Sequence, residues 1–255
     1  MRLACREHAS GAALNGKFYM AGGGRASQID SLLEKLQSLE LFDPTADVWE
    51  DMAAMDTKRS HCGAAVLDGK LYVAGGYDGT SLDVVERYDP LINSWESMAS
   101  LIIPRDEHGV AAVGGRLYVA GGVSGDTPLR SVECYDASTD SWQEVAPMAK
   151  GRSGHAVAVL NGMLYVAGGR TDGGLTNSVH RYDPAANAWE EVASMRLARL
   201  FCSAAVLDGK LYVAGGEGPD EGYTSSVECY DPSTNSWEEV APMRTGRCGL
   251  TLLCG

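Results

Sequence analysis

The sequence is short of positive charge. It has 21 Lys and Arg residues against 34 Asp and Glu residues, which gives a formal net charge of −13. Binding to a nucleic-acid backbone needs clustered Lys and Arg, so this balance argues against a nucleic-acid partner. No apolar run approaches the roughly 20 residues that a membrane-spanning helix needs. Charged residues interrupt the first twenty positions, so we expect neither a signal peptide nor a membrane partner.

Cysteine patterns that mark disulfide frameworks or zinc sites are also missing. The seven cysteines are an odd number and show no CxxC spacing. Cys62 and Cys202 fall at equivalent places in a repeat described below, and so do Cys134 and Cys229. Cysteines in such places are typical of small apolar strand residues. The pattern favours a reducing compartment, and we expect a cytoplasmic protein.

The dominant feature of the sequence is an internal repeat. An apolar run that stops at two glycines, as in LYVAGG ending at Gly76, occurs five times, with the first glycine at positions 22, 75, 121, 168 and 215. These positions are 53, 46, 47 and 47 residues apart. An aromatic-Asp pair begins at positions 42, 88, 135, 182 and 230, and a tryptophan follows at 49, 95, 142, 189 and 237. Arginines precede the copies at 6, 59, 105, 152 and 199, with a sixth at 247.

Each copy predicts four short antiparallel strands. In the second copy the small apolar strand at 63–67 is followed by Asp68-Gly69, a pair that supplies the positive φ of a tight hairpin. KLYVAGG forms the second strand, VVERYD the third, and a turn at Asp89-Pro90 leads to a fourth strand centred on Trp95. One such sheet cannot bury both of its faces, so neighbours must stack, and the compact arrangement is a ring of blades.

With Gly-Gly, Tyr-Asp and Trp at these offsets after an arginine, the sequence resembles the kelch repeat. The resemblance covers essentially the whole chain and is closest to the Kelch-like (BTB–BACK–kelch) proteins. It implies an all-β fold, a single β-propeller domain over 1–255. We expect repeats at 6–52, 59–98, 105–148, 152–195 and 199–243, and a lone closing strand at 244–255.

Two features depart from the family pattern. Kelch-like propellers usually have six blades, whereas five full repeats and one extra first strand are present here. We favour a six-bladed parent, in which strands two to four of one blade would precede Met1; closure with five blades is the alternative. The first repeat also carries an insertion at 27–42 whose leucines have helical spacing. Both a helical turn and an irregular loop are compatible with it.

The candidate binding surface follows from the strand directions. Residues just after each arginine and just after each Gly-Gly share one rim, and there the repeats diverge. Variable loops on a fixed scaffold are where binding usually resides, and by resemblance Kelch-like propellers hold substrate peptides at these positions. The candidate partner-binding residues are Glu7, His8, Ser60, His61, Tyr77, Asp106, Glu107, Ser153, Arg170, Phe201 and Glu217.

Other conspicuous residues have structural interpretations. The arginine column is expected to brace strands and carbonyl groups. His8, His61, His108 and His155 lie on different blades, so we predict no metal site. Gly22-Gly23-Gly24 is not followed by GKS or GKT, which excludes a phosphate loop, and we expect no cofactor. Tyr-Asp recurs in every repeat, whereas a catalytic carboxylate would more often be unique.

These observations favour a non-catalytic module that binds a peptide segment of a protein partner, of basic or mixed charge because the rim is rich in Asp and Glu. By resemblance it would be the substrate-recognition propeller of a cullin-RING ubiquitin ligase adaptor. An actin or cytoskeletal scaffold is the alternative. A second alternative is a kelch-type sugar-modifying enzyme, whose active-site pocket would be formed by Glu107, Arg170 and His61.

Overall fold

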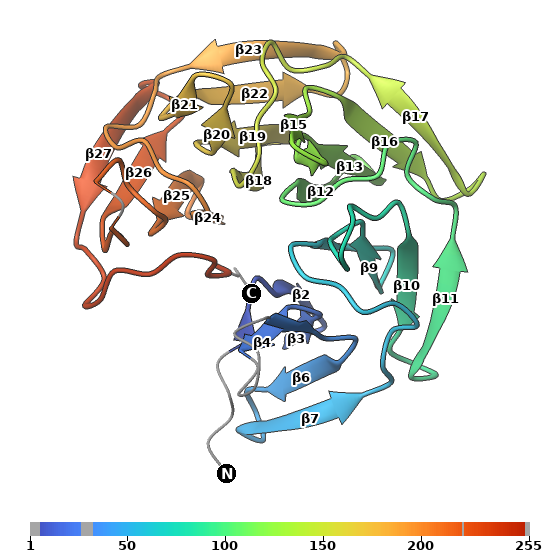
Figure 1. Cartoon of the computed structure of the whole chain (residues 1–255). Helices are drawn as coiled ribbons and strands as arrows, with labels where there is room; N and C mark the ends of the chain where they lie inside the picture. Colours follow the sequence, from blue (N-terminus) through green and yellow to red (C-terminus); the bar gives the residue numbers. More distant parts are fainter. Residues whose placement is uncertain (1–5, 27–32, 221, 253–255) are drawn as a thin grey trace.

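The computed structural model describes residues 6–26, 33–220 and 222–252, and over these residues the protein is built from β-strands. Five four-stranded antiparallel sheets, here called blades 1 to 5, follow one another along the chain. Figure 1 shows them arranged around a central axis, with the first strand of each blade innermost and the fourth at the periphery. The all-β fold of four-stranded blades predicted from the repeat is therefore confirmed.

The blades have nearly identical strand lengths and pairing. Blade 1 contains β2 (Ser10–Leu14), β3 (Lys17–Ala21), β6 (Leu39–Asp43) and β7 (Val48–Met52). Blade 2 contains β8 (Gly63–Leu67), β9 (Lys70–Ala74), β10 (Val85–Asp89) and β11 (Ser94–Met98). Blade 3 contains β12 (Gly109–Val113), β13 (Arg116–Ala120), β16 (Val132–Asp136) and β17 (Ser141–Val145). Blade 4 contains β18 (Ala156–Leu160), β19 (Met163–Ala167), β22 (Val179–Asp183) and β23 (Ala188–Val192). Blade 5 contains β24 (Ser203–Leu207), β25 (Lys210–Ala214), β26 (Val227–Asp231) and β27 (Ser236–Val240).

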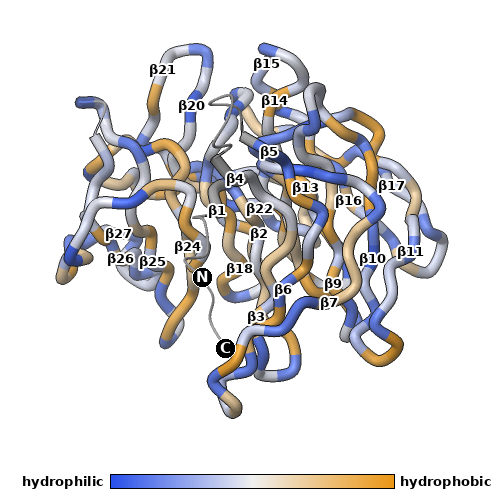
Figure 2. The backbone as a smooth tube through the Cα atoms, turned by 60° about the horizontal axis from the view of Figure 1, so that its bottom comes forward, coloured by the Kyte–Doolittle hydropathy of each residue, from blue (hydrophilic) through white to orange (hydrophobic). Residues whose placement is uncertain are grey.

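Shorter strands lie outside the blades. A three-stranded sheet joins β1 (Arg6–Glu7), β4 (Gly24–Ala26) and β5 (Leu33–Lys35). Two small hairpins follow the glycine pairs of blades 3 and 4: β14 (Val123–Ser124) with β15 (Thr127–Pro128), and β20 (Arg170–Thr171) with β21 (Gly174–Leu175). Figure 2 shows both hairpins projecting from the same rim.

The insertion of the first repeat is only partly described. Residues 27–32 lie outside the described residues. From 33 to 42 the chain forms β5 and most of β6, so the described part of the insertion is extended rather than helical. Leu39 and Leu41 lie on the same side of strand β6, and both are buried.

The glycine pairs are required by close backbone approach. In blade 2, Gly75 and Gly76 have φ values of 57° and 106°. A Cβ on Gly75 would lie 2.5 Å from the carbonyl oxygen of Arg105, and one on Gly76 would lie 2.8 Å from that of Ser60. No side chain fits at these distances, so the second strand of the blade must end at glycine.

The arginine column holds these turns from inside the blades, as the sequence predicted. Arg59, Arg105, Arg152 and Arg199 are buried. Each donates a hydrogen bond to the carbonyl of the first glycine in its own repeat, at 2.9, 2.8, 3.1 and 2.9 Å respectively. In blades 2, 3 and 5 the guanidinium also pairs with a buried carboxylate: Glu86, Glu133 and Glu228.

Neighbouring blades are joined by the same polar contacts each time. Trp95 of blade 2 donates from Nε1 to the carbonyl of Ala53, in the linker that leaves blade 1, at 2.7 Å. Asn93 Oδ1 accepts from the amide of Ala53 at 2.9 Å and from the hydroxyl of Tyr88 at 2.8 Å. Trp142, Trp189 and Trp237 make the same contact with the linkers after blades 2, 3 and 4. Around them the apolar cores form between blades rather than within one.

Candidate functional site

A ring of backbone hydrogen bonds surrounds the propeller axis at one rim. The residue two positions after each arginine has a positive φ between 52° and 59° in every copy. From His61 round to Gly249, five of these residues donate their amides to the carbonyl of the counterpart in the preceding copy, at 3.1, 3.0, 2.9, 2.7 and 2.9 Å. The ring consists of His8, His61, Glu107, Gly154, Phe201 and Gly249. It therefore has six members, although five blades are present.

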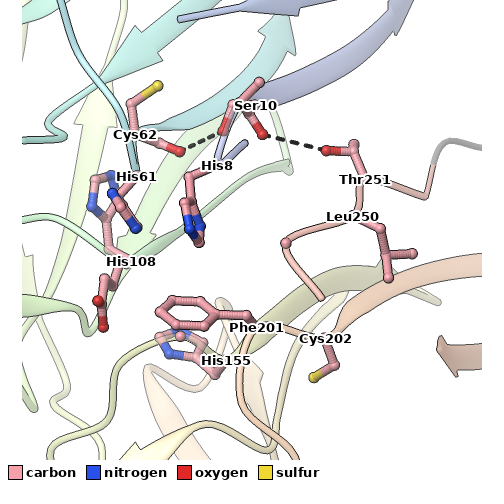
Figure 3. A pocket seen from close by; sticks show the side chains of 14 residues that line it. His8, Ser10, His61, Cys62, His108, His155, Phe201, Cys202, Leu250 and Thr251 are labelled. Atoms are coloured by element: carbon pink, nitrogen blue, oxygen red, sulfur yellow. Dashed lines mark hydrogen bonds between the residues drawn. The ribbon is translucent and has the colours of Figure 1, made fainter. Parts of the chain in front are cut away.

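Aromatic side chains of this ring cluster at the axis. The imidazoles of His8 and His61 are stacked with their centroids 3.9 Å apart, and Phe201 meets His8 edge-on at 5.3 Å. Figure 3 shows the three side chains converging over a small axial cavity of about 150 Å³. Burial, with smaller contributions from the nearby His8 and Lys35 charges, lowers the pKa of His61 to about 4. A neutral His61 can stack on His8 without charge repulsion.

The predicted rim residues are brought together in pairs. The residue after an arginine faces the residue after the Gly-Gly pair of the same copy: Ser60 with Tyr77, Ser153 with Arg170, and Leu200 with Glu217. Asp106 faces Val123 in the same way. Glu7 pairs with Gly24 through the backbone of β1 and β4. The expectation that these positions share one rim is met for each described pair.

Two neighbouring grooves lie on this rim. One, of about 680 Å³, runs between blades 2 and 3 and includes His61, Tyr77 and Asp106 in its walls. The other, of about 390 Å³, runs between blades 3 and 5 across Ser153, Arg170, Phe201 and Glu217. They share four residues: Glu107, Val123, Gly125 and Asp126.

Carboxylates at the junction of the grooves are partly removed from water. Asp106 is buried, and Ser81 donates a hydrogen bond to its Oδ2 at 2.7 Å. Burial raises the pKa of Asp106. Burial also raises the pKa of Glu107, with Asp106 adding to the effect and Ser153 and Arg170 opposing it. Negative charge held at reduced solvation in a groove favours a cationic ligand group.

Sequence reasoning missed part of these walls. Gly125 and Asp126 belong to the β14–β15 hairpin, and Ser81 belongs to the loop after the blade 2 glycines. These loops differ between copies in length and composition, which is the signal that could have found them. Their contact with a neighbouring blade depends on the ring and could not be read from the repeat.

The remaining histidines have structural surroundings. His108 is buried, and its Nε2 lies 3.1 Å from the carbonyl oxygen of Ala74 in the preceding blade. His180 lies beside Arg152 inside blade 4. Within 6–26, 33–220 and 222–252, no three His, Cys, Asp or Glu residues are grouped so as to hold a metal ion. The same residues contain no helix long and apolar enough to cross a membrane.

Comparison with known proteins agrees with the geometry. The family described as the Attractin/LZTR1 beta-propeller matches residues 117–251, more than half of the chain, and the Kelch motif matches residues 58–102. The solved structure titled "Structure of YjhT" superposes with a TM-score of 0.85 over 99% of this chain and 88% of that one, at 20% identity. That likeness concerns the fold alone.

Curated relatives share shorter segments. The spermatocyte protein spe-26 of Caenorhabditis elegans is 32% identical over 65 residues, covering 26% of this chain and 11% of the relative. The influenza virus NS1A-binding protein homolog of Mus musculus is 41% identical over 73 residues, covering 29% and 10%. The human influenza virus NS1A-binding protein is 40% identical over the same length, with the same coverage. The match thus spans about a tenth of each relative. With its kelch repeats and five four-stranded blades, the chain belongs to the Attractin/LZTR1 family of kelch β-propellers.

Proposed function

We propose that this propeller is a non-catalytic protein-interaction module whose rim grooves bind a peptide segment of a partner. The observation that carries the proposal is the junction of the two grooves at Glu107, where divergent loops of neighbouring blades meet. The surrounding scaffold repeats almost unchanged, while the groove walls differ from copy to copy. Such a division between constant frame and variable loops is typical of binding surfaces.

The peptide is proposed to be basic or of mixed charge. Asp106, Glu107 and Asp126 line one groove, and Glu217 lines the other, against one lining cation, Arg170. A second cation, Lys35, lies over the Tyr77 ring with its Nζ 5.4 Å from the ring centroid, so this aromatic surface already holds a long cationic side chain. Phe201 adds further aromatic surface. An acidic peptide would meet repulsion in both grooves.

Two relatives are named for binding another protein, the influenza virus NS1A protein. Those names support a protein partner here without naming which one. The proposal extends to the role of substrate-recognition propeller in a cullin-RING ubiquitin ligase adaptor. A cytoskeletal scaffold would use the same rim, and identification of the captured protein separates the two.

The test is a peptide selection followed by titration. Peptides would be selected from a randomised displayed library against the 255-residue chain, and affinities measured by fluorescence anisotropy. We expect selected peptides to be enriched in Lys or Arg. Tyr77→Ala should weaken their binding at least ten-fold, and Arg170→Glu should strengthen it because it makes the groove more negative. Binding should also weaken with added salt, because exposed charge pairs are screened.

The matched control lies on the opposite rim. Leu91 and Ile92, in the turn between β10 and β11, are highly exposed, so Leu91→Ser with Ile92→Ser alters a large surface without touching either groove. Unchanged affinity is expected for this control. If the rim variants leave the affinity unchanged, the assignment of the rim is wrong. Turnover of a sugar by the chain would instead support the enzyme alternative.

A further inference from the structure

The first and fifth blades each present an apolar face that no other blade of the described residues covers. Figure 1 shows the ring open between blade 5 and blade 1, with the segment after β27 running into the opening. In blade 1 the side chain of Trp49 is 52% exposed. Phe18, Met20 and Phe42 are only half-buried, whereas their counterparts in blades 2 to 5 are fully buried.

The facing side of blade 5 shows the same pattern. Leu207 is 56% exposed, whereas Leu14, Leu67, Val113 and Leu160, its counterparts in the other blades, are between 2% and 7% exposed. Tyr212 and Val227 are also more exposed than their counterparts. Both faces therefore carry the residues of a blade–blade interface, and no blade in the part of the chain that the structure describes supplies the second half of either.

The segment after blade 5 enters the inner position that a sixth blade would take. The linker after blade 5 repeats the earlier ones: Gly216 donates to the carbonyl of Arg247 at 2.7 Å, as Gly169 does to that of Arg199 at 2.8 Å. Gly249 then takes the sixth place in the axial ring, where a Cβ would lie 3.4 Å from Nδ1 of His8.

Beyond Gly249 the chain contacts both flanking blades. Thr251 Oγ1 donates to the carbonyl of Ala9 at 3.5 Å, and the amide of Leu252 donates to Ser203 Oγ at 2.9 Å (Figure 3 shows Thr251 facing the Ser10 segment). The lone closing strand predicted at 244–255 does not form over 244–252, where the backbone has bends and irregular structure, and 253–255 lie outside the described residues. By alignment with the first strands of the five blades, such a strand would begin at 251.

The surroundings of Arg247 differ from those of its counterparts in the other repeats. Its four described counterparts in blades 2 to 5 are at most 2% exposed, and each binds the carbonyl of a first glycine. Three of them also bind a glutamate on the third strand. The side chain of Arg247 is exposed. It is the sixth member of a column whose function elsewhere is to hold a Gly-Gly strand and a carboxylate.

We infer that the opening is a docking surface for a three-stranded antiparallel β-sheet of kelch-blade type, supplied by polypeptide other than these 255 residues. Its first strand ends in Gly-Gly and offers a carbonyl to Arg247. Its second strand carries a glutamate for the same guanidinium, and its third carries a tryptophan that donates to Ala241. The linker after that strand offers a carbonyl to Trp49, as Ala53 does to Trp95.

The test supplies this sheet from the chain itself. A copy of residues 70–104, which form strands two to four of blade 2 and the linker to Arg105, would replace residues 1–5 directly before Arg6. Acrylamide quenching of Trp49 is obtained as the difference between each protein and its Trp49→Phe variant. With the copy present we expect quenching of Trp49 to fall to the level of Trp95, and the melting temperature to rise by about 5 °C. Arg247→Ala should reverse the rise.

The matched control carries valine in place of both glycines, corresponding to 75 and 76, within the inserted copy. A Cβ at these positions clashes with the backbone, so docking should fail and Trp49 should stay exposed. Equal quenching of Trp49 in the two proteins overturns the inference. So does a 255-residue chain that is already dimeric with Trp49 protected, since a second copy then fills the opening. If both fusions are insoluble, the segment is co-expressed as a tagged separate chain, and failure to co-purify contradicts the inference.

Discussion

Arg152 donates a hydrogen bond to Nδ1 of His180 at 2.9 Å, at the place where the other described arginines of the column meet a glutamate. Those glutamates also accept backbone amides of the incoming linker, as Glu133 does from Ile102 at 2.7 Å. His180 carries no formal negative charge to offset the buried guanidinium. Burial accordingly lowers the pKa of Arg152 to about 10. Among the four buried arginines of the column that the structure describes, Arg152 is thus the one without a carboxylate partner.

The first prediction concerns this pair. His180→Glu should restore the ion pair of the other blades and raise the free energy of unfolding by about 1.5–3 kcal/mol, the range for a hydrogen bond to a charged group. Urea denaturation at pH 7.5 measures it. As a control, Glu133→His should lower stability in blade 3 by creating the arrangement of blade 4. A neutral or destabilising effect of His180→Glu would contradict the interpretation.

The second prediction concerns pH. Burial lowers the pKa of His108 and of His155 to about 3, from an ordinary value of 6.5. Below pH 6.5 these two histidines become protonated in the unfolded chain, whereas in the folded chain they stay neutral until the pH approaches 3. The contribution of these histidines is therefore complete above pH 6.5 and is lost as pH falls toward 3. Between pH 7.5 and 5 the loss should be on the order of 1–2 kcal/mol for each histidine.

The repeat supplies matched replacements for this measurement. Cys62 and Cys202 occupy the equivalent positions in the repeats of blades 2 and 5. The substitutions His108→Cys and His155→Cys therefore introduce a residue that other copies of the repeat already carry at this position. The double variant should show a flatter dependence of unfolding free energy on pH between 7.5 and 5. A slope identical to that of the unmodified chain would show that these histidines do not control acid stability.

The third prediction compares two tryptophans with the same place in the repeat. Trp95→Ala removes a hydrogen bond and packing between blades 1 and 2 and should lower stability by about 2–4 kcal/mol. Trp49→Ala removes a side chain that is half in solvent and should cost less than about 1 kcal/mol. Chemical denaturation of both variants gives the comparison. Equal costs would mean that Trp49 is covered in solution.

The fourth prediction separates backbone conformation from close approach at glycine. Gly69 and Gly75 both have positive φ, but a Cβ on Gly69 would meet nothing within 4 Å, whereas one on Gly75 would lie 2.5 Å from a carbonyl oxygen. Gly69→Ala should therefore cost about 1–2 kcal/mol, the conformational term alone. Gly75→Ala should cost clearly more or prevent folding. Thermal unfolding of the two variants measures the difference, and equal melting temperatures would refute it.

Part of the site was predictable and part was not. Arg, Gly-Gly and the strand directions placed Ser60 beside Tyr77 and Ser153 beside Arg170, because both members of each pair belong to one repeat. The stacking of His8 on His61 joins residues of successive repeats, and the contact of His8 with Phe201 spans the ring. Those contacts depend on how far each blade turns about the axis, which no local pattern encodes.

The sequence by itself determined the strands, their order in each blade and the framework roles of glycine, arginine and tryptophan, because these depend on near neighbours in the chain and recur in every copy. Only the tertiary structure decided which copies of one pattern are buried. Trp49 and Trp95 occupy the same place in their repeats, yet only Trp95 has a hydrogen-bond acceptor in a preceding blade's linker. Likewise Arg247 repeats Arg199 in sequence but is exposed, since burial of either depends on the blade beside it.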